Sequence, residues 1–494
     1  MGISLGAAVA ISDVVAVARR RERVSFEPSV DVALAASRAV VDAVLAEGKP
    51  VYGLNTELGA GRDIVVSGEK LEAFQRRIIR NSSGGIGDPL SDEQARAVIF
   101  ARLAGFTRGG SGVRPALAEQ YKELLNRDAA VLIPRTGSVG AADLTHLAAV
   151  AAVASGTGRG FLGVQNGPGH TAPSVPGAEV LAAIGLEPIT LAPHEGLASL
   201  SGNSYSVGVG ALVVNDLEVT AVAADRVLAL SISALGSSTS GGNVSPFTAV
   251  VSAAHPAEGQ SESAHRLRAL LGDGAGASTQ DPVSFRAGAQ VHGAFVESVA
   301  TAADAVELEL NSRTENPLVD IATGTMVSNG NFQVLGLALS FESLRLALGH
   351  VAATSERRLA RLSTLTAAAR RDGSARVPGL LWYSSAALVS EVRQLANPVT
   401  LLAPSLSEDV EDHSSNAAVA LQLLERSQQL TRTVLAIEAI TAAELVLLAA
   451  DGARIARTTV TAPLRSIVEV VAAQLDADAT ADELVTAVEA ELFG

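Results

Sequence analysis

The side chains of this chain that could do chemistry are Tyr52, Arg286 and Glu411, each in a short polar motif between apolar stretches. Cysteine is absent, which excludes disulfides, thiolate nucleophiles and cysteine-ligated metals. The eight histidines show no metal-binding spacing such as His-Glu-x-x-His, so no metal is expected. Chemistry therefore has to come from proton transfer and charge recognition by oxygen and nitrogen groups.

Each of these residues has a functional and a structural interpretation. Tyr52 opens a glycine-rich segment, residues 52–68, that is typical of a mobile loop and does not fit a phosphate-binding loop. Its phenol serves as a base only if its pKa falls well below about 10. Arg286 offers parallel donors to a carboxylate, or forms a structural ion pair. Glu411 can hold an ammonium or act as a base if burial raises its pKa, or it belongs to an acidic cluster before a helix.

Seven stretches between Val51 and Asn416 resemble, in order, motifs of the aromatic amino-acid ammonia-lyase and aminomutase family, which includes histidine and phenylalanine ammonia-lyases. The resemblance is carried by residues 51–56, 80–87, 137–144, 194–203, 280–290, 311–333 and 410–416. It implies a mainly α ammonia-lyase-like fold with a central bundle of long helices and a glycine-rich N-terminal domain. It also implies a homotetramer in which each active site draws on three subunits.

The most informative stretch is Gly137-Ser138-Val139-Gly140-Ala141-Ala142-Asp143-Leu144. In the family the run reads Gly-Ser-Val-Gly-Ala-Ser-Gly-Asp-Leu, and its Ala-Ser-Gly cyclises and dehydrates to a methylidene-imidazolone (MIO). Here the loop is one residue shorter, and alanine has no hydroxyl to lose as water. We therefore expect no cofactor at Ala141, Ala142 and Asp143, and MIO only if Ala141 or Ala142 stands for a modified tripeptide.

The resemblance assigns catalytic roles to Tyr52, a general base on a lid, and to Glu411, close to the substrate amine. Ser82 matches the position that lines the pocket for the substrate side chain, where a histidine would suit an imidazole substrate, so ordinary histidine degradation is disfavoured. Arg286 matches the arginine that grips the substrate carboxylate. The substrate-binding positions implied are Ser82, Arg286, Gln290, Asn316 and Phe332.

Other departures from the family pattern gather around the same function. Ser201 stands where the family has the asparagine that stabilises MIO, and Val283 replaces a tyrosine that assists near it. Glu57 brings a negative charge into the lid, which counts against an aromatic substrate. Positions that would hold a substrate are therefore kept, whereas positions that would make or polarise MIO are changed.

This pattern favours an enzyme that works without MIO. Such an enzyme transfers a proton and eliminates or adds a group, or isomerises its substrate, next to a carboxylate. One alternative is a true MIO-dependent ammonia-lyase or aminomutase. Another is a non-catalytic protein that kept the pocket and binds a carboxylate. The first interpretation requires Tyr52 and Arg286 to share one cavity of the assembled oligomer.

Composition limits the remaining possibilities. The 494 residues are 48% hydrophobic and carry a net charge of −15, which argues against nucleic acid or an anionic membrane as a partner. Residues 1–10 lack a basic signal region, and no run of about 18 apolar residues is uninterrupted, so we expect a cytoplasmic protein.

We expect an N-terminal domain over residues 1–204 and a long-helix bundle with a helical tail over 205–494. Ser355-Glu356-Arg357-Arg358 is interpreted as an exposed charge network.

Overall fold

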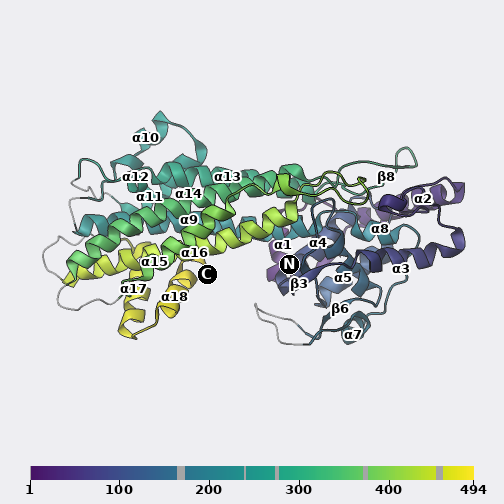
Figure 1. Cartoon of the computed structure of the whole chain (residues 1–494), viewed down its shortest axis with the longest axis horizontal. Helices are drawn as coiled ribbons and strands as arrows, with labels where there is room; N and C mark the ends of the chain where they lie inside the picture. The colour runs from purple at the N-terminus through teal and green to yellow at the C-terminus, as the bar shows by residue number, and fades with distance from the viewer. Residues whose placement is uncertain (1, 164–172, 239–240, 273–277, 371–376, 452–459) are drawn as a thin grey trace. The chain divides into compact units, whose positions relative to one another are not determined.

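A computed structural model describes residues 2–163, 173–238, 241–272, 278–370, 377–451 and 460–494, and most of these residues are helical. The chain divides into two compact units, each made of segments far apart in the sequence (Figure 1). Unit 1 contains Met1–Asn215, Ala303–Leu339 and Val399–Leu421, and unit 2 contains Asp216–Ala302, Ser340–Pro398 and Gln422–Gly494. Unit 1 thus holds the expected N-terminal segment together with two later stretches.

Unit 1 combines short helices with small sheets. Its helices are α1 (Ile11–Arg19), α2 (Pro28–Glu47), α3 (Leu71–Ser82), α4 (Asp92–Thr107), α5 (Pro115–Asn126), α6 (Leu144–Ala154), α7 (Gly177–Ala183) and α8 (Glu195–Leu200). One sheet is the parallel pair β1 (Ile3–Leu5) and β2 (Val24–Phe26). The antiparallel sheets are β3 (Ile86–Pro89) with β5 (Pro134–Thr136), β4 (Ala130–Val131) with β6 (Arg159–Phe161) and β7 (Val175–Pro176), and β8 (Leu318–Asp320) with β9 (Thr325–Val327). Short 3-10 turns, η1 (Gly59–Gly61), η2 (Gly68–Lys70) and η4 (Thr400–Leu402), lie in its loops.

Helix α4 is buried on nearly every face and forms the core of unit 1. Its start is fixed by a capping box, in which Ser91 Oγ accepts from the Gln94 N–H at 3.3 Å and Gln94 Oε1 accepts from the Ser91 N–H at 3.2 Å. Four of its sixteen residues are alanines, all of them buried, and their small side chains let neighbouring helices approach closely.

Helix α2 begins and ends at residues suited to these places. Its N-cap is Glu27, and Pro28 begins the helix with a fixed φ and no N–H to satisfy. The helix ends at Gly48, which adopts the left-handed conformation at φ 72° that glycine reaches without steric cost.

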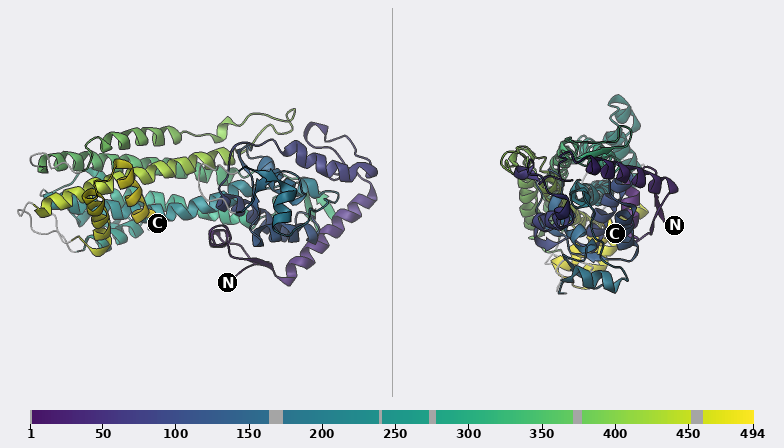
Figure 2. Two further views of the ribbon diagram at one scale, coloured as in Figure 1. Left: turned by 90° about the horizontal axis from the view of Figure 1, so that it is seen from below. Right: turned by 90° about the vertical axis from the view of Figure 1, so that its right-hand side faces the viewer.

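Unit 2 is built on long helices that run side by side (Figures 1 and 2). Parts of α9 (Ser204–Ser238), α13 (Gly288–Leu310), α14 (Leu335–Ala369) and α16 (Ala417–Asp451) belong to it. Its shorter elements are η3 (Ser245–Phe247), α10 (Ala249–Ala254), α11 (Glu258–Leu271), α12 (Val283–Arg286), α15 (Leu381–Leu395), α17 (Ala462–Asp476) and α18 (Ala481–Phe493). The expected tail is thus two helices, because Thr480 starts a new one: its hydroxyl accepts from the Glu483 N–H.

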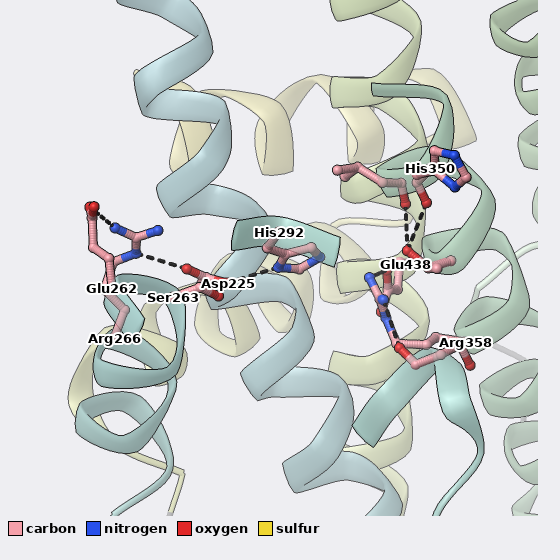
Figure 3. A network of polar contacts seen from close by, with 11 residues as sticks. Asp225, Glu262, Ser263, Arg266, His292, His350, Arg358 and Glu438 are labelled. Atoms are coloured by element: carbon pink, nitrogen blue, oxygen red, sulfur yellow. Dashed lines mark hydrogen bonds and ion pairs between the residues drawn. The ribbon is translucent and has the colours of Figure 1, made fainter. Parts of the chain in front are cut away.

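A buried ion pair joins three helices of unit 2 (Figure 3). Arg358 of α14 and Glu438 of α16 are fully buried, with Nε–Oε1 at 2.6 Å and Nη2–Oε2 at 2.9 Å. Ser231 of α9 donates to the same carboxylate at 2.6 Å. The interpretation of residues 355–358 as an exposed network is therefore wrong for Arg358, because a bidentate partner on another helix compensates its burial.

A second polar cluster of unit 2 surrounds the carboxylate of Asp225 (Figure 3). His292 Nδ1 lies 2.8 Å from Oδ1, Ser263 Oγ donates to the same oxygen at 2.7 Å, and Arg266 Nε donates to Oδ2 at 2.7 Å. These contacts connect α9, α11 and α13 and satisfy a fully buried charge.

Two stretches of the described chain, Glu195–Ser237 and Leu335–Ala369, are long and apolar enough in composition to cross a membrane. Their most apolar windows are 72% and 50% buried inside the protein, and a core helix meets the same criteria. Length and composition therefore do not distinguish the two possibilities.

Candidate active site

A cavity of about 710 Å³ in unit 1 gathers most of the residues that the sequence singled out. Six parts of the chain line it: the lid segment that begins at Tyr52, helix α3, the loop before α6 with the start of that helix, the end of α8, residues 316–332, and the loop that ends at Glu411. The predicted site residues among its lining are Tyr52, Ser82, Ala141, Ala142, Asn316, Phe332 and Glu411.

Helix α3 contributes one face to the cavity. Its lining residues follow the spacing of three and four that places side chains on one side of a helix: Phe74, Arg77, Ile78, Asn81 and Ser82. Ser82 therefore lines the cavity at the end of a stripe that is otherwise half polar.

Tyr52 is held at the cavity by its own lid. Its Oη accepts a hydrogen bond from the Gly59 N–H at 3.0 Å, and Asn55 fixes the backbone before it by accepting from the Val51 N–H at 2.7 Å. Burial raises the pKa of the Tyr52 phenol; the Gly59 hydrogen bond opposes this, and the charge of Glu411 adds to it. The phenol is thus protonated near neutral pH, whereas a resting phenolate base would need the opposite shift.

Glu411 reaches the cavity from a tight turn. The Leu406 and Glu411 backbones form an antiparallel bridge, with hydrogen bonds of 2.9 and 3.2 Å. Between them, Ser407, Glu408 and Asp409 have φ values of 57°, 53° and 63°, in the left-handed region. This conformation costs about 1 kcal/mol or more for each non-glycine residue. Burial raises the pKa of Glu411, which brings its proton exchange closer to neutral pH.

The loop that resembles the MIO-forming segment is tightly tied to its surroundings. Gly140 has φ 87°, and a Cβ there would overlap the Ser415 hydroxyl. Ser138 Oγ lies 2.8 Å from Asp143 Oδ1 and accepts from the Gly140 N–H at 3.0 Å. The buried Asp143 accepts from the Ser206 N–H at 2.8 Å, and Ala142 has φ 62°. Asp143 thus anchors the loop, and Ala141, Ala142 and Leu144 of this segment line the cavity.

Asparagines and a serine form the wall beside this loop. Ser201 Oγ accepts from the Asn316 N–H at 2.8 Å, and Asn316 Oδ1 accepts from the Asn329 N–H at 3.0 Å. Asn203 does not line the cavity, and both of its amide atoms are buried without a partner. It therefore does not replace the asparagine that the family has at the position of Ser201.

Charged side chains that sequence reasoning missed also line the cavity. Arg77 pairs with Glu57 through Nη2, and Arg62 Nε lies 3.9 Å from Asp63 Oδ2. Glu57 thus belongs to the cavity. The four-residue step back from Asn81, the neighbour of Ser82, to Arg77 was a usable signal for Arg77, whereas nothing in the lid sequence distinguished Arg62.

Arg286 and Gln290 are not among the residues that line this cavity. Both belong to unit 2, where Arg286 ends α12 and Gln290 lines a separate hollow with Val250 and His255. With its amide oxygen turned toward Arg286, Gln280 accepts from Nε at 3.2 Å and Nη2 at 2.9 Å. Val283, on the same short helix, is 61% exposed.

Within the described residues no cluster of three His, Asp or Glu side chains could hold a metal ion.

Comparison with known proteins shows the family to which this chain belongs. The family model described as aromatic amino acid lyase matches residues 9–472. Histidine ammonia-lyase from Anaeromyxobacter dehalogenans is 35% identical over 457 residues, covering 89% of this chain and 88% of its own. Tyrosine aminomutase from Streptomyces globisporus superposes with a TM-score of 0.88 at 25% identity, over 100% of this chain and 98% of its own. The ergothioneine-degrading enzyme from Treponema denticola superposes with a TM-score of 0.89 at 23% identity, over 100% of this chain and 98% of its own. The predicted fold is confirmed.

Proposed function

From the premise that the chain belongs to the aromatic amino acid lyase family, we propose a carbon–nitrogen lyase-type enzyme that works without MIO. It transfers a proton and eliminates or adds a group, or isomerises its substrate, next to a carboxylate. The observation that carries this proposal is one cavity lined by Tyr52, Glu411 and the Ala141-Ala142 pair.

The residues present do not fit the MIO group. Ala141 and Ala142 have no side-chain hydroxyl to lose, and the nearby Ser138 hydroxyl is hydrogen-bonded to Asp143 and Gly140. Ser201 uses its oxygen to accept from the Asn316 backbone. The reaction is therefore not assigned to an electrophile of this kind. The substrate has to supply its own activation, through a better leaving group than an unactivated amine or through a more acidic C–H bond.

The proton transfer is assigned to Tyr52 and Glu411. Since burial raises both pKa values, Tyr52 carries the proton at rest and Glu411 is the group that ionises first. Glu411 accepts the proton released from the carbon next to the carboxylate, directly or through the phenol. Gly59 N–H donates to the phenol oxygen and so stabilises negative charge that develops on it. Asn316 and Phe332 border the bound substrate.

We also propose a cytoplasmic homotetramer in which Arg286 and Gln290 of a neighbouring copy complete the site and hold the substrate carboxylate. The position of both residues in unit 2, outside the lining of the unit-1 cavity, supports this. A guanidinium suits the role because it presents paired donors and stays charged.

Mass and proton exchange together test the proposal. The intact mass should equal that of the 494-residue sequence, with no near-ultraviolet band beyond tyrosine and tryptophan. NMR in D₂O should show Tyr52-dependent exchange of the proton next to the carboxylate in a panel of amino acids and their unsaturated products. A mass that requires extra residues at 141–142 would instead support an MIO enzyme. Binding of these compounds with no exchange would support a non-catalytic protein.

A further inference from the structure

The α3 wall of the cavity carries three hydrogen-bonding side chains beside the apolar Phe74 and Ile78. Asn81 and Ser82 stand at its end, and the guanidinium of Arg77 lies one turn earlier. Pockets for apolar side chains are lined mainly by hydrophobic groups with few polar ones. This wall is therefore suited to a polar or charged part of the substrate.

Arg77 has donors to spare. Its Nη2 pairs with Glu57 Oε1, and its guanidinium carbon lies 5.2 Å from the centre of the Phe74 ring. No other hydrogen bond to Arg77 is found in the described part of the chain, so Nε and Nη1 remain available. The side chain is 43% exposed, which leaves it open to a ligand.

The lid supplies a carboxylate for each arginine of the cavity. Glu57 pairs with Arg77, and Asp63 lies at 3.9 Å from Arg62. The pairs are partly exposed, and exposed pairs of this kind contribute little to stability. A substrate anion can therefore take the place of a lid carboxylate without a large loss of folding stability.

The absence of a built-in electrophile places a demand on the substrate. Removal of a proton from Cβ needs somewhere for the bonding electrons to go. A carboxylate on Cβ meets this demand, because it accepts the electrons as an enediolate, and a guanidinium stabilises the added charge.

We propose, on the basis of the function proposed above, that the substrate is a 2-substituted succinate and that Arg77 binds the carboxylate on Cβ. The step balances within the substrate. Glu411 takes the Cβ proton, directly or through Tyr52, and the C–H electron pair moves into the Cβ carboxylate. That pair then forms the Cα=Cβ bond as the C–N pair leaves with the amine nitrogen. The products are an unsaturated dicarboxylate and a neutral amine, and no oxidant or reductant is needed. The cavity volume leaves room for a substituent on the nitrogen.

Calorimetric binding of fumarate to the full-length protein tests the recognition. Fumarate should bind more tightly than cinnamate, and Arg77→Met should weaken fumarate binding at least tenfold, whereas Arg77→Lys should weaken it less. Arg76→Met is the matched control, because Arg76 neighbours Arg77 on α3, pairs with Glu72 and does not line the cavity. It should change binding less than twofold.

Glu57→Gln gives a test of opposite sign. Removing the competing charge frees Arg77, so fumarate should bind several times more tightly. If the ion pair only fastens the lid, this variant would weaken binding instead, and the inference would fail. It would also fail if cinnamate bound more tightly than fumarate, or if Arg77→Met left fumarate binding unchanged.

Proton exchange at Cβ of L-aspartate separates this inference from the proposed function. Arg77-dependent fumarate binding without any exchange or turnover would uphold the recognition and overturn the enzyme. Tyr52-dependent turnover of an aromatic substrate that is unaffected by Arg77→Met would uphold the enzyme and overturn the recognition.

Discussion

The phenol of Tyr52 and the carboxylate of Glu411 line one cavity, and the charge of the carboxylate helps to raise the pKa of the phenol. The two groups reach the cavity from segments more than 350 residues apart, each held by its own backbone contacts. Their coupling means that a proton gained by one group favours ionisation of the other. A pair of this kind can pass a proton without requiring a stable phenolate at rest.

Tyr52→Phe should lower turnover by about 10²–10⁴-fold, the usual contribution of a positioned acid–base group. The fold should survive, because the substitution removes only the hydroxyl that accepts from Gly59. Tyr383, which is 65% exposed in unit 2, offers a matched Tyr→Phe control that should keep full activity. Steady-state kinetics with thermal melting as a folding check would measure both; full activity in Tyr52→Phe would remove Tyr52 from the mechanism.

Glu411→Gln should remove the acidic limb of the pH–rate profile. Burial raises the pKa of Glu411, so kcat/KM of the native enzyme should rise with pH through a value above the ordinary glutamate range. The kcat/KM of the variant should be lower and should not change with pH over the same interval. Asp412→Asn changes the exposed neighbouring residue and should leave the limb in place. An unchanged limb in Glu411→Gln would assign the ionisation to another group.

The motif order resembles a known family and singled out residues that line one cavity, whereas their catalytic and binding roles stay predictions. Tyr52, Ser82, Asn316, Phe332 and Glu411 were predicted as site residues, and the structure places all of them in one cavity. Arg77 was missed, because its pairing with a lid residue depends on how a loop folds onto a helix. The burial of Arg358 was missed for a similar reason, since its partner Glu438 lies 80 residues away on another helix.

The bundle of long helices was expected from the resemblance of the motifs to a known family. Their assembly into units was less accessible. Unit 1 takes Ala303–Leu339 and Val399–Leu421 from late in the chain, and local patterning carries no information on such long-range contacts. The meeting of Arg286 and Tyr52 across copies stays a prediction.

Arg358→Met should destabilise the protein by about 3–5 kcal/mol, because it leaves the fully buried Glu438 without its bidentate partner. Arg357, the next residue, is 67% exposed and lies 3.5 Å from Glu356. Arg357→Met should therefore cost less than about 1 kcal/mol. Chemical denaturation of both variants would measure the difference, and similar losses would mean that the buried pair is not the reason for the position of Arg358.

Glu309→Gln should change how stability depends on pH. Burial raises the pKa of Glu309 to about 7, above its value in the unfolded chain, so folding favours the protonated form. The stabilising contribution of that proton is fully present below about pH 4.5 and is lost as pH rises through about 7. Between these two pH values the free energy of unfolding of the native protein should therefore fall by up to about 3 kcal/mol relative to that of the glutamine variant. Asp304→Asn, exposed on the same helix α13, should show no such relative change, and urea unfolding at pH 4.5, 6 and 8 would measure it. Parallel pH curves for the native protein and Glu309→Gln would mean that water or a neighbouring copy already solvates the carboxylate.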